Sequence, residues 1–205
     1  MSGLRERKKE QTRRALSDAA IALFLKKGFD AVSVAEIADA ADVSKPTLFR
    51  YFPAKEDLAL HRFADHEDEA ARVVAGRPAD LSPLDALRAH VLDGLERRDP
   101  VTGLCDHPAV LAFQRLLYGT PALVARMYAY QSRSAAALAE SLGDEPGADA
   151  LGARVAAGQI VAVLRILAEE NVRRIDAGES ADALHGEAVE AAERAFAGLR
   201  DGLPY

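Results

Sequence analysis

The 205-residue chain contains one cysteine, Cys105, and no tryptophan. A single cysteine excludes an internal disulfide and is consistent with a reducing compartment. The longest apolar run, residues 160–168, is interrupted by Arg165, and the N-terminus begins with charged residues. We therefore expect no membrane span, no secretion signal and no membrane partner, and we expect a cytoplasmic protein.

Catalytic and metal-binding signatures are also missing from the sequence. It has no Ser-His-Asp signature, no glycine loop that would cradle a phosphate and no paired-cysteine motif. Its five histidines are not spaced like metal ligands. These absences predict a protein that is not an enzyme and that carries no cofactor and no metal.

Lysine is absent after Lys55, so positive charge gathers near the N-terminus. Residues 1–63 hold 12 Lys+Arg and 9 Asp+Glu, whereas the rest of the chain holds 14 and 23, so that a net charge of -6 divides into +3 and -9. This asymmetry predicts an anion-binding N-terminal part and an acidic body that does not contact nucleic acid.

Residues 33–51 have the pattern of two short helices joined by a tight turn. Ser33 is a typical N-cap, and apolar residues then recur with helical spacing at Val34, Ile37, Ala38 and Ala41. Asp42 tolerates the left-handed conformation that ends such a helix. Ser44 is the next N-cap, and Pro46 fits the first turn of the second helix.

The second helix has one apolar stripe and one face rich in hydrogen-bond donors. Leu48 and Phe52 are four residues apart and predict the buried side, and Pro53 ends the helix. The other face carries Lys45, Thr47, Phe49, Arg50 and Tyr51. This arrangement is typical of a helix-turn-helix, whose second helix enters the major groove of DNA.

The run VSVAEIADAADVSKPTLFRYFPAKEDL resembles the N-terminal domain of the TetR family of bacterial transcriptional regulators, over about residues 8–63. The resemblance implies an all-α fold of about nine helices. It implies a helix-turn-helix DNA-binding domain at residues 1–54 and a ligand-binding and dimerisation domain at 55–205, linked by a helix at 55–76. The chain departs from the family at Asp42, where glycine is usual, and at Ala54, where a capping serine or asparagine is usual.

The DNA-binding residues follow from the pattern and the resemblance together. Arg50 is our first choice for reading base edges, and the resemblance assigns contacts with the DNA backbone to Thr47, Tyr51 and Lys55. The basic stretch from Arg5 to Arg14 either contacts DNA or is a solvated helix end. The full predicted set is Ser33, Val34, Ser44, Lys45, Pro46, Thr47, Phe49, Arg50, Tyr51 and Lys55.

Beyond residue 76 the pattern predicts further helices at about residues 82–98, 120–142, 149–177 and 180–199. It also predicts a helix that ends near residue 119. The helix at 149–177 is apolar on all sides around residues 160–167, so it must be covered on all sides. We expect a second subunit to cover one side, which agrees with the dimer interface that the resemblance implies for the last two helices.

Candidate ligand-binding residues in the body are aromatic or apolar residues, or polar residues within apolar helices. They are His90, Phe113, Leu117, Met127, Tyr128, Gln131, Gln159 and Arg165. Aromatic and apolar residues at this spacing also fit a plain core, and Arg165 with Glu169 also fits an ordinary ion pair.

The sequence thus predicts a homodimeric regulator that binds a palindromic double-stranded DNA operator. The resemblance favours a repressor that is released by a small apolar or amphipathic effector. Two alternatives are an activator of the same fold and an interaction protein that has lost DNA binding.

Overall fold

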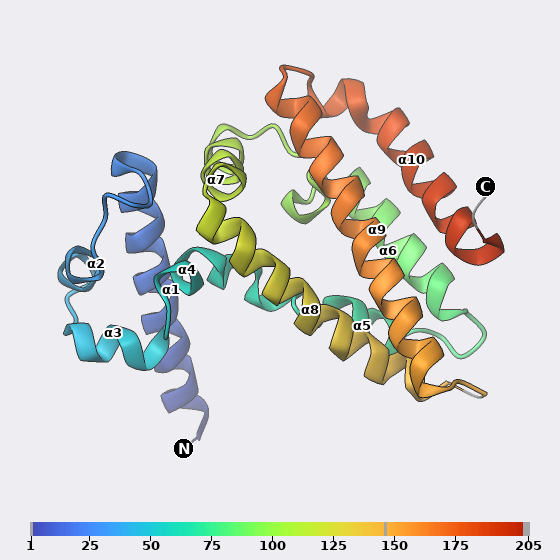
Figure 1. Ribbon diagram of the computed structural model, residues 1–205, viewed down its shortest axis with the longest axis horizontal. Coiled ribbons are helices and arrows are strands. Elements are labelled where there is room, and N and C mark those ends of the chain that lie inside the picture. Colours follow the sequence, from blue (N-terminus) through green and yellow to red (C-terminus); the bar gives the residue numbers. More distant parts are fainter. Residues whose placement is uncertain (1, 146, 203–205) are drawn as a thin grey trace. The chain divides into compact units, whose positions relative to one another are not determined.

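The computed structural model describes residues 2–145 and 147–202, and within them the chain forms ten α-helices and two short 3-10 helices (Figure 1). The described residues contain no strand, and the predicted all-α fold is confirmed. The chain divides into two compact units. The first comprises residues 1–65 and 112–129, and the second comprises residues 66–111 and 130–205.

The first unit is built on α1 (Ser2–Lys27), α2 (Val34–Ala40), α3 (Lys45–Tyr51) and α4 (Lys55–Leu60). The residues of α7 (Pro108–Gly119) and α8 (Pro121–Gly143) that lie between 112 and 129 complete it. The long first helix packs against α2 and α4. The core of the first unit consists of buried side chains from all of these elements, among them Leu16, Phe24, Ile37, Leu48, Leu58, Leu117 and Leu123.

The continuous helix predicted at 55–76 is wrong, because the chain forms three shorter elements there. After α4 it forms a 3-10 helix, η1 (His61–His66), and then α5 (Glu69–Ala75). The run Asp65-His66-Glu67-Asp68-Glu69 puts four carboxylates in five positions. Like charges four positions apart, such as Asp65 and Glu69, disfavour a continuous helix through this stretch.

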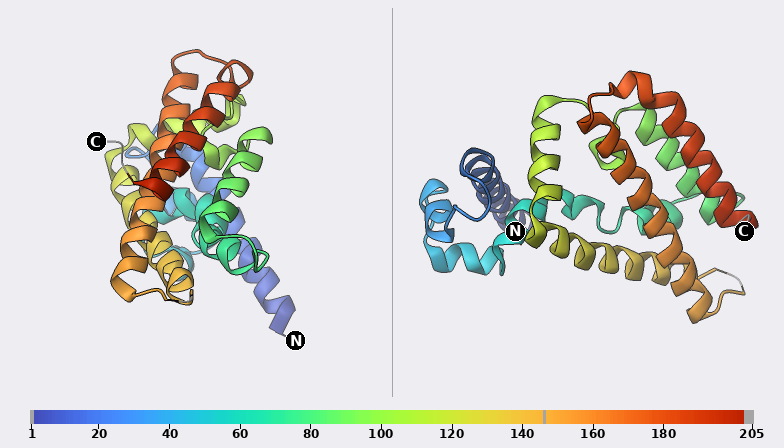
Figure 2. Two further views of the ribbon diagram at one scale, coloured as in Figure 1. Left: turned by 90° about the vertical axis from the view of Figure 1, so that its right-hand side faces the viewer. Right: turned by 45° about the horizontal axis from the view of Figure 1, so that its top comes forward.

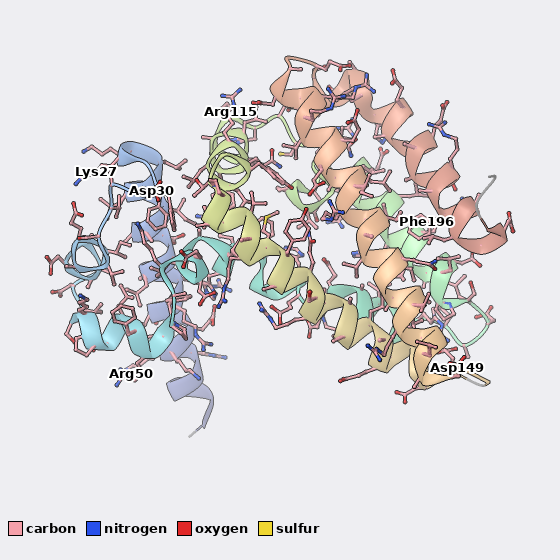
Figure 3. All side chains as sticks on the ribbon, in the orientation of Figure 1. Lys27, Asp30, Arg50, Arg115, Asp149 and Phe196 are labelled. Atoms are coloured by element: carbon pink, nitrogen blue, oxygen red, sulfur yellow. The ribbon has the colours of Figure 1, made fainter. Side chains whose placement is uncertain are left out.

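The second unit has α6 (Pro83–Glu96), α9 (Ala150–Asp176) and α10 (Ala181–Asp201) running side by side (Figures 1 and 2). Ser82, Asp149 and Ser180 are the N-caps of these helices, since the side chain of each accepts a backbone N–H bond at the start of its helix. Phe196 of α10, labelled in Figure 3, is 1% exposed in a core shared with α6 and α9. Close packing of these three helices therefore supplies most of the core of this unit.

The loop after η2 (Pro100–Thr102) passes very close to α9. Gly103 has φ of 74°, and a Cβ at this position would lie 2.1 Å from the carbonyl oxygen of Ala168. The side-chain amide of Asn171 donates a hydrogen bond of 2.9 Å to the carbonyl oxygen of Thr102 and holds the same loop. Only glycine combines this backbone conformation with this approach.

Helix α9 leaves a stripe of apolar side chains uncovered within the chain. Leu151, Val155 and Ile166 are 68%, 51% and 55% exposed, whereas Ala157 and Ile160 on another side are buried. By length and composition alone, α9 is the one helix in the described part of the chain that could cross a membrane. Such a signal is weak, because core helices of soluble proteins share it.

Candidate nucleic-acid interface

Local hydrogen bonds at the predicted caps Ser33 and Ser44 form the starts of α2 and α3. The hydroxyl of Ser33 accepts from the N–H of Glu36, and the carboxylate of Glu36 accepts from the N–H of Ser33, which forms a capping box. Asp42 has φ of 53°, so the predicted left-handed residue at the turn is confirmed. Ser44 caps α3 by accepting from the N–H of Thr47 at 3.3 Å.

Helix α3 has one buried side and one exposed side. Leu48 is 0% exposed and Phe52, which follows the helix, is 5% exposed, so both anchor α3 to the core of the first unit. Lys45, Phe49 and Arg50 are exposed, and Arg50 extends away from the ribbon in Figure 3. The side of α3 that faces away from the core therefore presents two cations and one aromatic ring, as the sequence predicts.

The other residues of the predicted set lie around this exposed face. Ser33, Ser44 and Pro46 are exposed, and Val34 is half-buried against the core. Thr47 and Tyr51 are half-buried on α3. The hydroxyl of Thr47 forms a 2.8 Å hydrogen bond with that of Ser44, and the guanidinium of Arg50 lies 5.5 Å from the ring centroid of Tyr51.

Lys55 occupies a position that the sequence alone does not reveal. Its ammonium donates a 2.5 Å hydrogen bond to the carbonyl oxygen of Phe29 and lies 4.2 Å from the centroid of the Phe29 ring. The ring of Phe24 lies 5.5 Å from the same ammonium. A cation held over aromatic rings is stabilised by the ring quadrupole. Lys55 thus joins the start of α4 to the turn after α1 in this structure.

The start of α4 lacks a side-chain cap, as the sequence predicts for Ala54. Asp57 compensates in part, because its carboxylate accepts a 3.2 Å hydrogen bond from the N–H of Ala54. The same carboxylate forms two bonds with the guanidinium of Arg126 on α8, at 2.7 and 2.9 Å.

One further ion pair connects α1 with α2. The ammonium of Lys27 lies 2.8 Å from a carboxylate oxygen of Glu36. This hydrogen bond, together with those from Ser33, lowers the pKa of Glu36 to about 2. Glu36 is therefore ionised at neutral pH, which keeps the capping box of α2 intact.

Residues 16–61 match a family model described as bacterial regulatory proteins, tetR family. TcmR, a transcriptional regulator of Streptomyces glaucescens, is 32% identical over 72% of this chain and 66% of its own length. The chain belongs to the TetR family.

Two further proteins extend the comparison. The transcriptional repressor KstR of Rhodococcus jostii is 34% identical over 45% of this chain and 44% of its own length. The crystal structure of NalD, the secondary repressor of the MexAB-OprM multidrug efflux pump in Pseudomonas aeruginosa, has a TM-score of 0.58 at 20% identity, covering 91% of this chain and 97% of NalD. NalD supports the TetR fold, and the sequence relatives support a transcriptional regulator rather than an enzyme.

The candidate ligand-binding residues of this TetR-family chain divide between the two units. Leu117 belongs to the core of the first unit, and Phe113 and Met127 pack against that core. Tyr128, also in the first unit, is 53% exposed. The remaining candidates, which belong to the second unit, are His90, Gln131, Gln159 and Arg165.

Within the second unit the polar candidates have different environments. Gln159 is exposed on α9. The prediction that it is buried within an apolar helix is therefore wrong for one copy of the chain taken alone. Arg165 pairs with Glu169 at 2.7 Å, in agreement with the predicted ion pair. His90 lies 3.3 Å from Glu69, which also bonds to His66 at 2.7 Å. The hydrogen bond that His90 donates to the carboxylate of Glu69 raises the pKa of His90, and the bonds from His66 and His90 hold the pKa of Glu69 far below its usual value.

Sequence reasoning missed three buried polar residues of this TetR-family chain. Ser17 is 2% exposed and donates to the carbonyl oxygen of Leu58, and Asn171 is 9% exposed and bonds to the loop before Gly103. Gln114 is 6% exposed, and its side-chain oxygen has no hydrogen-bond partner. Gln114 lies three residues before Leu117 on α7, which places the two side chains on the same side of the helix. This spacing was the feature of the sequence that indicated that Gln114 is buried.

A polar hollow of about 350 Å³ lies in the first unit. Its lining residues come from α1 and from the stretch after α4, and they are Glu10, Arg14, Ser17, Asp18, His61 and Arg62. None of them belongs to the predicted ligand set. Because the lining is mainly charged, the hollow does not match an apolar effector.

Proposed function

We propose that this TetR-family regulator is a repressor that binds a palindromic DNA operator as a homodimer. The observation that carries the proposal is the exposed face of α3, where Lys45, Phe49 and Arg50 extend from a helix held by the cap Ser44 and the buried Leu48. This presentation of donors by the second helix of a helix-turn-helix fits the major groove. KstR, to which the chain is similar, is described as a repressor, which favours repression over activation.

The proposed contacts differ in what they read. Arg50 and Lys45 are the candidates for base edges, since guanidinium and ammonium groups donate to guanine acceptors. Thr47 and Tyr51 flank them and are the candidates for phosphate contacts, which fix register without reading sequence. Lys55 is a third candidate for a phosphate contact, and one of its three ammonium donors bonds to the carbonyl oxygen of Phe29.

The uncovered stripe of α9 supports a homodimer. Leu151, Val155 and Ile166 are each more than half exposed, and Gly158, also exposed on α9, permits close approach of a second helix. A second copy of the chain would remove this apolar surface from water. A two-fold dimer would then place two recognition helices about 34–36 Å apart, or a multiple of this, to match successive half-sites.

The proposed effector is a small apolar or amphipathic molecule that binds the helical body and weakens DNA binding. A coupling of about 1–3 kcal/mol between the two sites would change operator affinity about 5- to 150-fold. We place the protein in the cytoplasm, where operator DNA is accessible.

The test is a titration of the protein against DNA from upstream of its own gene, in which fluorescence anisotropy of the DNA measures binding. We expect specific binding that weakens steeply with salt, and we expect Arg50→Ala to lose about 1–3 kcal/mol of discrimination between operator and unrelated DNA. Arg97→Ala is the matched control, because Arg97 is an exposed arginine of the second unit that pairs with the nearby Asp93 and Asp99. If wild-type protein shows no specific binding at low salt, or if Arg50→Ala and Arg97→Ala behave alike, the proposal is wrong.

A further inference from the structure

The ion pair between Arg126 and Asp57 joins two segments 69 residues apart in the sequence. Nε of Arg126 lies 2.7 Å from one carboxylate oxygen of Asp57, and Nη2 lies 2.9 Å from the other. The side chains are 38% and 20% exposed, so water reaches the pair only in part. Two parallel charge-assisted bonds also fix the orientation of the carboxylate, which a single contact does not.

The oriented carboxylate has a second role at the start of α4. One of its oxygens accepts the N–H of Ala54, which is the N-cap residue of α4 and has no side-chain acceptor of its own. The first N–H groups of a helix have no intrahelical partner, so this bond satisfies a donor that would otherwise depend on water. Arg126 therefore holds the group that organises the first turn of α4.

The first turn of α4 lies directly after the recognition helix. Only residues 52–54 separate α3, which ends at Tyr51, from α4, which begins at Lys55. Phe52 is 5% exposed, and its ring packs edge-on against the ring of His61 at the end of α4, with 5.3 Å between centroids. A shift of α4 therefore moves the end of α3 as well, because a connection this short cannot absorb it.

We infer that Arg126 is a positioning residue for DNA recognition, which acts through Asp57 and α4 on α3 without touching DNA. The inference rests on the proposed DNA-binding function and assigns a role in it to a residue of α8. When the pair is broken, each head occupies the binding geometry for only part of the time. Apparent affinity falls in proportion to that fraction, so a fraction of about one third in each of two heads lowers operator affinity about tenfold.

The experiment compares Arg126→Met, Asp57→Asn and the double variant in operator titrations over a range of salt. Asp57→Asn removes the charge but keeps an oxygen that can accept the N–H of Ala54, so it isolates the ion pair from the cap. Arg133→Met is the matched control, since Arg133 lies on the same helix and forms the same two-bond pair with Glu67 but belongs to the second unit. Circular dichroism at the titration temperature verifies that each variant is folded.

We expect each single variant at the Arg126–Asp57 pair to bind the operator about tenfold more weakly, with the salt dependence unchanged. The double variant should be no weaker than either single variant, because the two residues act as one unit. Arg126→Lys should recover part of the affinity, and Arg133→Met should bind like wild type.

Three results would overturn the inference. The first is unchanged operator affinity in folded Arg126→Met. The second is a smaller salt dependence of binding in that variant, which would make Arg126 a phosphate ligand. The third is additive losses of affinity in the double variant. If wild-type protein binds no DNA specifically, the proposed function itself fails, and this outcome is distinct from the other three.

Discussion

Replacing Gly103 by alanine tests the packing of the second unit, and the resulting loss of stability can be estimated from the structure. A left-handed backbone costs a residue with a Cβ about 1–2 kcal/mol. The new Cβ would also lie 2.1 Å from the backbone carbonyl oxygen of Ala168, and no side-chain rotation can move either atom away. Overpacking of this kind costs about 1–3 kcal/mol. We therefore expect Gly103→Ala to destabilise the protein by about 2–5 kcal/mol in total.

Gly178→Ala is the matched control for this experiment. Gly178 also has a positive φ, of 104°, but a Cβ there would meet nothing within 4 Å. It should therefore show the conformational cost alone. Urea and thermal unfolding followed by circular dichroism, at one fixed protein concentration, measure both variants.

For a chain of this size, the estimate for Gly103→Ala corresponds to a fall in thermal midpoint of about 4–20 °C. The reasoning is refuted if Gly103→Ala unfolds like wild type, or if its loss equals that of Gly178→Ala. The second result would show that the approach of the loop to α9 contributes nothing beyond the backbone conformation.

Three further predictions concern the dimer, the helix-turn-helix and pH. Ile166→Asp should shift the protein towards monomer in sedimentation velocity, because it places a charge on the apolar stripe of α9. Ser33→Ala should lower unfolding free energy by about 1 kcal/mol in urea titrations, through loss of the N-cap of α2. Glu69→Gln should lower the thermal midpoint more at pH 6 than at pH 9. The depressed pKa of Glu69 stabilises the fold above the usual carboxylate pKa, whereas the raised pKa of His90 stabilises it below the usual histidine pKa and loses its effect as pH rises.

The helix-turn-helix was predictable from sequence because local interactions determine it. Ser33 bonds to a residue three positions later, and Ser44 does the same. The left-handed turn at Asp42 follows from the few residue types that adopt this conformation. Each of these features depends on one residue type at one spacing, and the buried Leu48 then fixes which face of α3 points outward.

The environment of the start of α4 was not predictable in the same way. Lys55 bonds to Phe29, and Asp57 bonds to Arg126, across 26 and 69 residues. Periodicity indicates which side of a helix is buried, but it does not say which distant partner a long charged side chain will meet. For the same reason, the sequence predicted a phosphate contact for Lys55 without revealing its hydrogen bond inside the protein.

Helix α9 shows how one sequence pattern can have two structural explanations. Its apolar composition is compatible with a membrane span, but Ala157, Ile160 and Ile175 are buried in the core of the second unit. A membrane-spanning α9 would have to leave that core, exposing the surfaces of α6 and α10 that pack around it. A protein interface requires no such loss, because the exposed Leu151 and Ile166 can be covered while the buried side stays in place. The division of α9 into a buried side and an uncovered stripe therefore favours a second protein subunit over lipid.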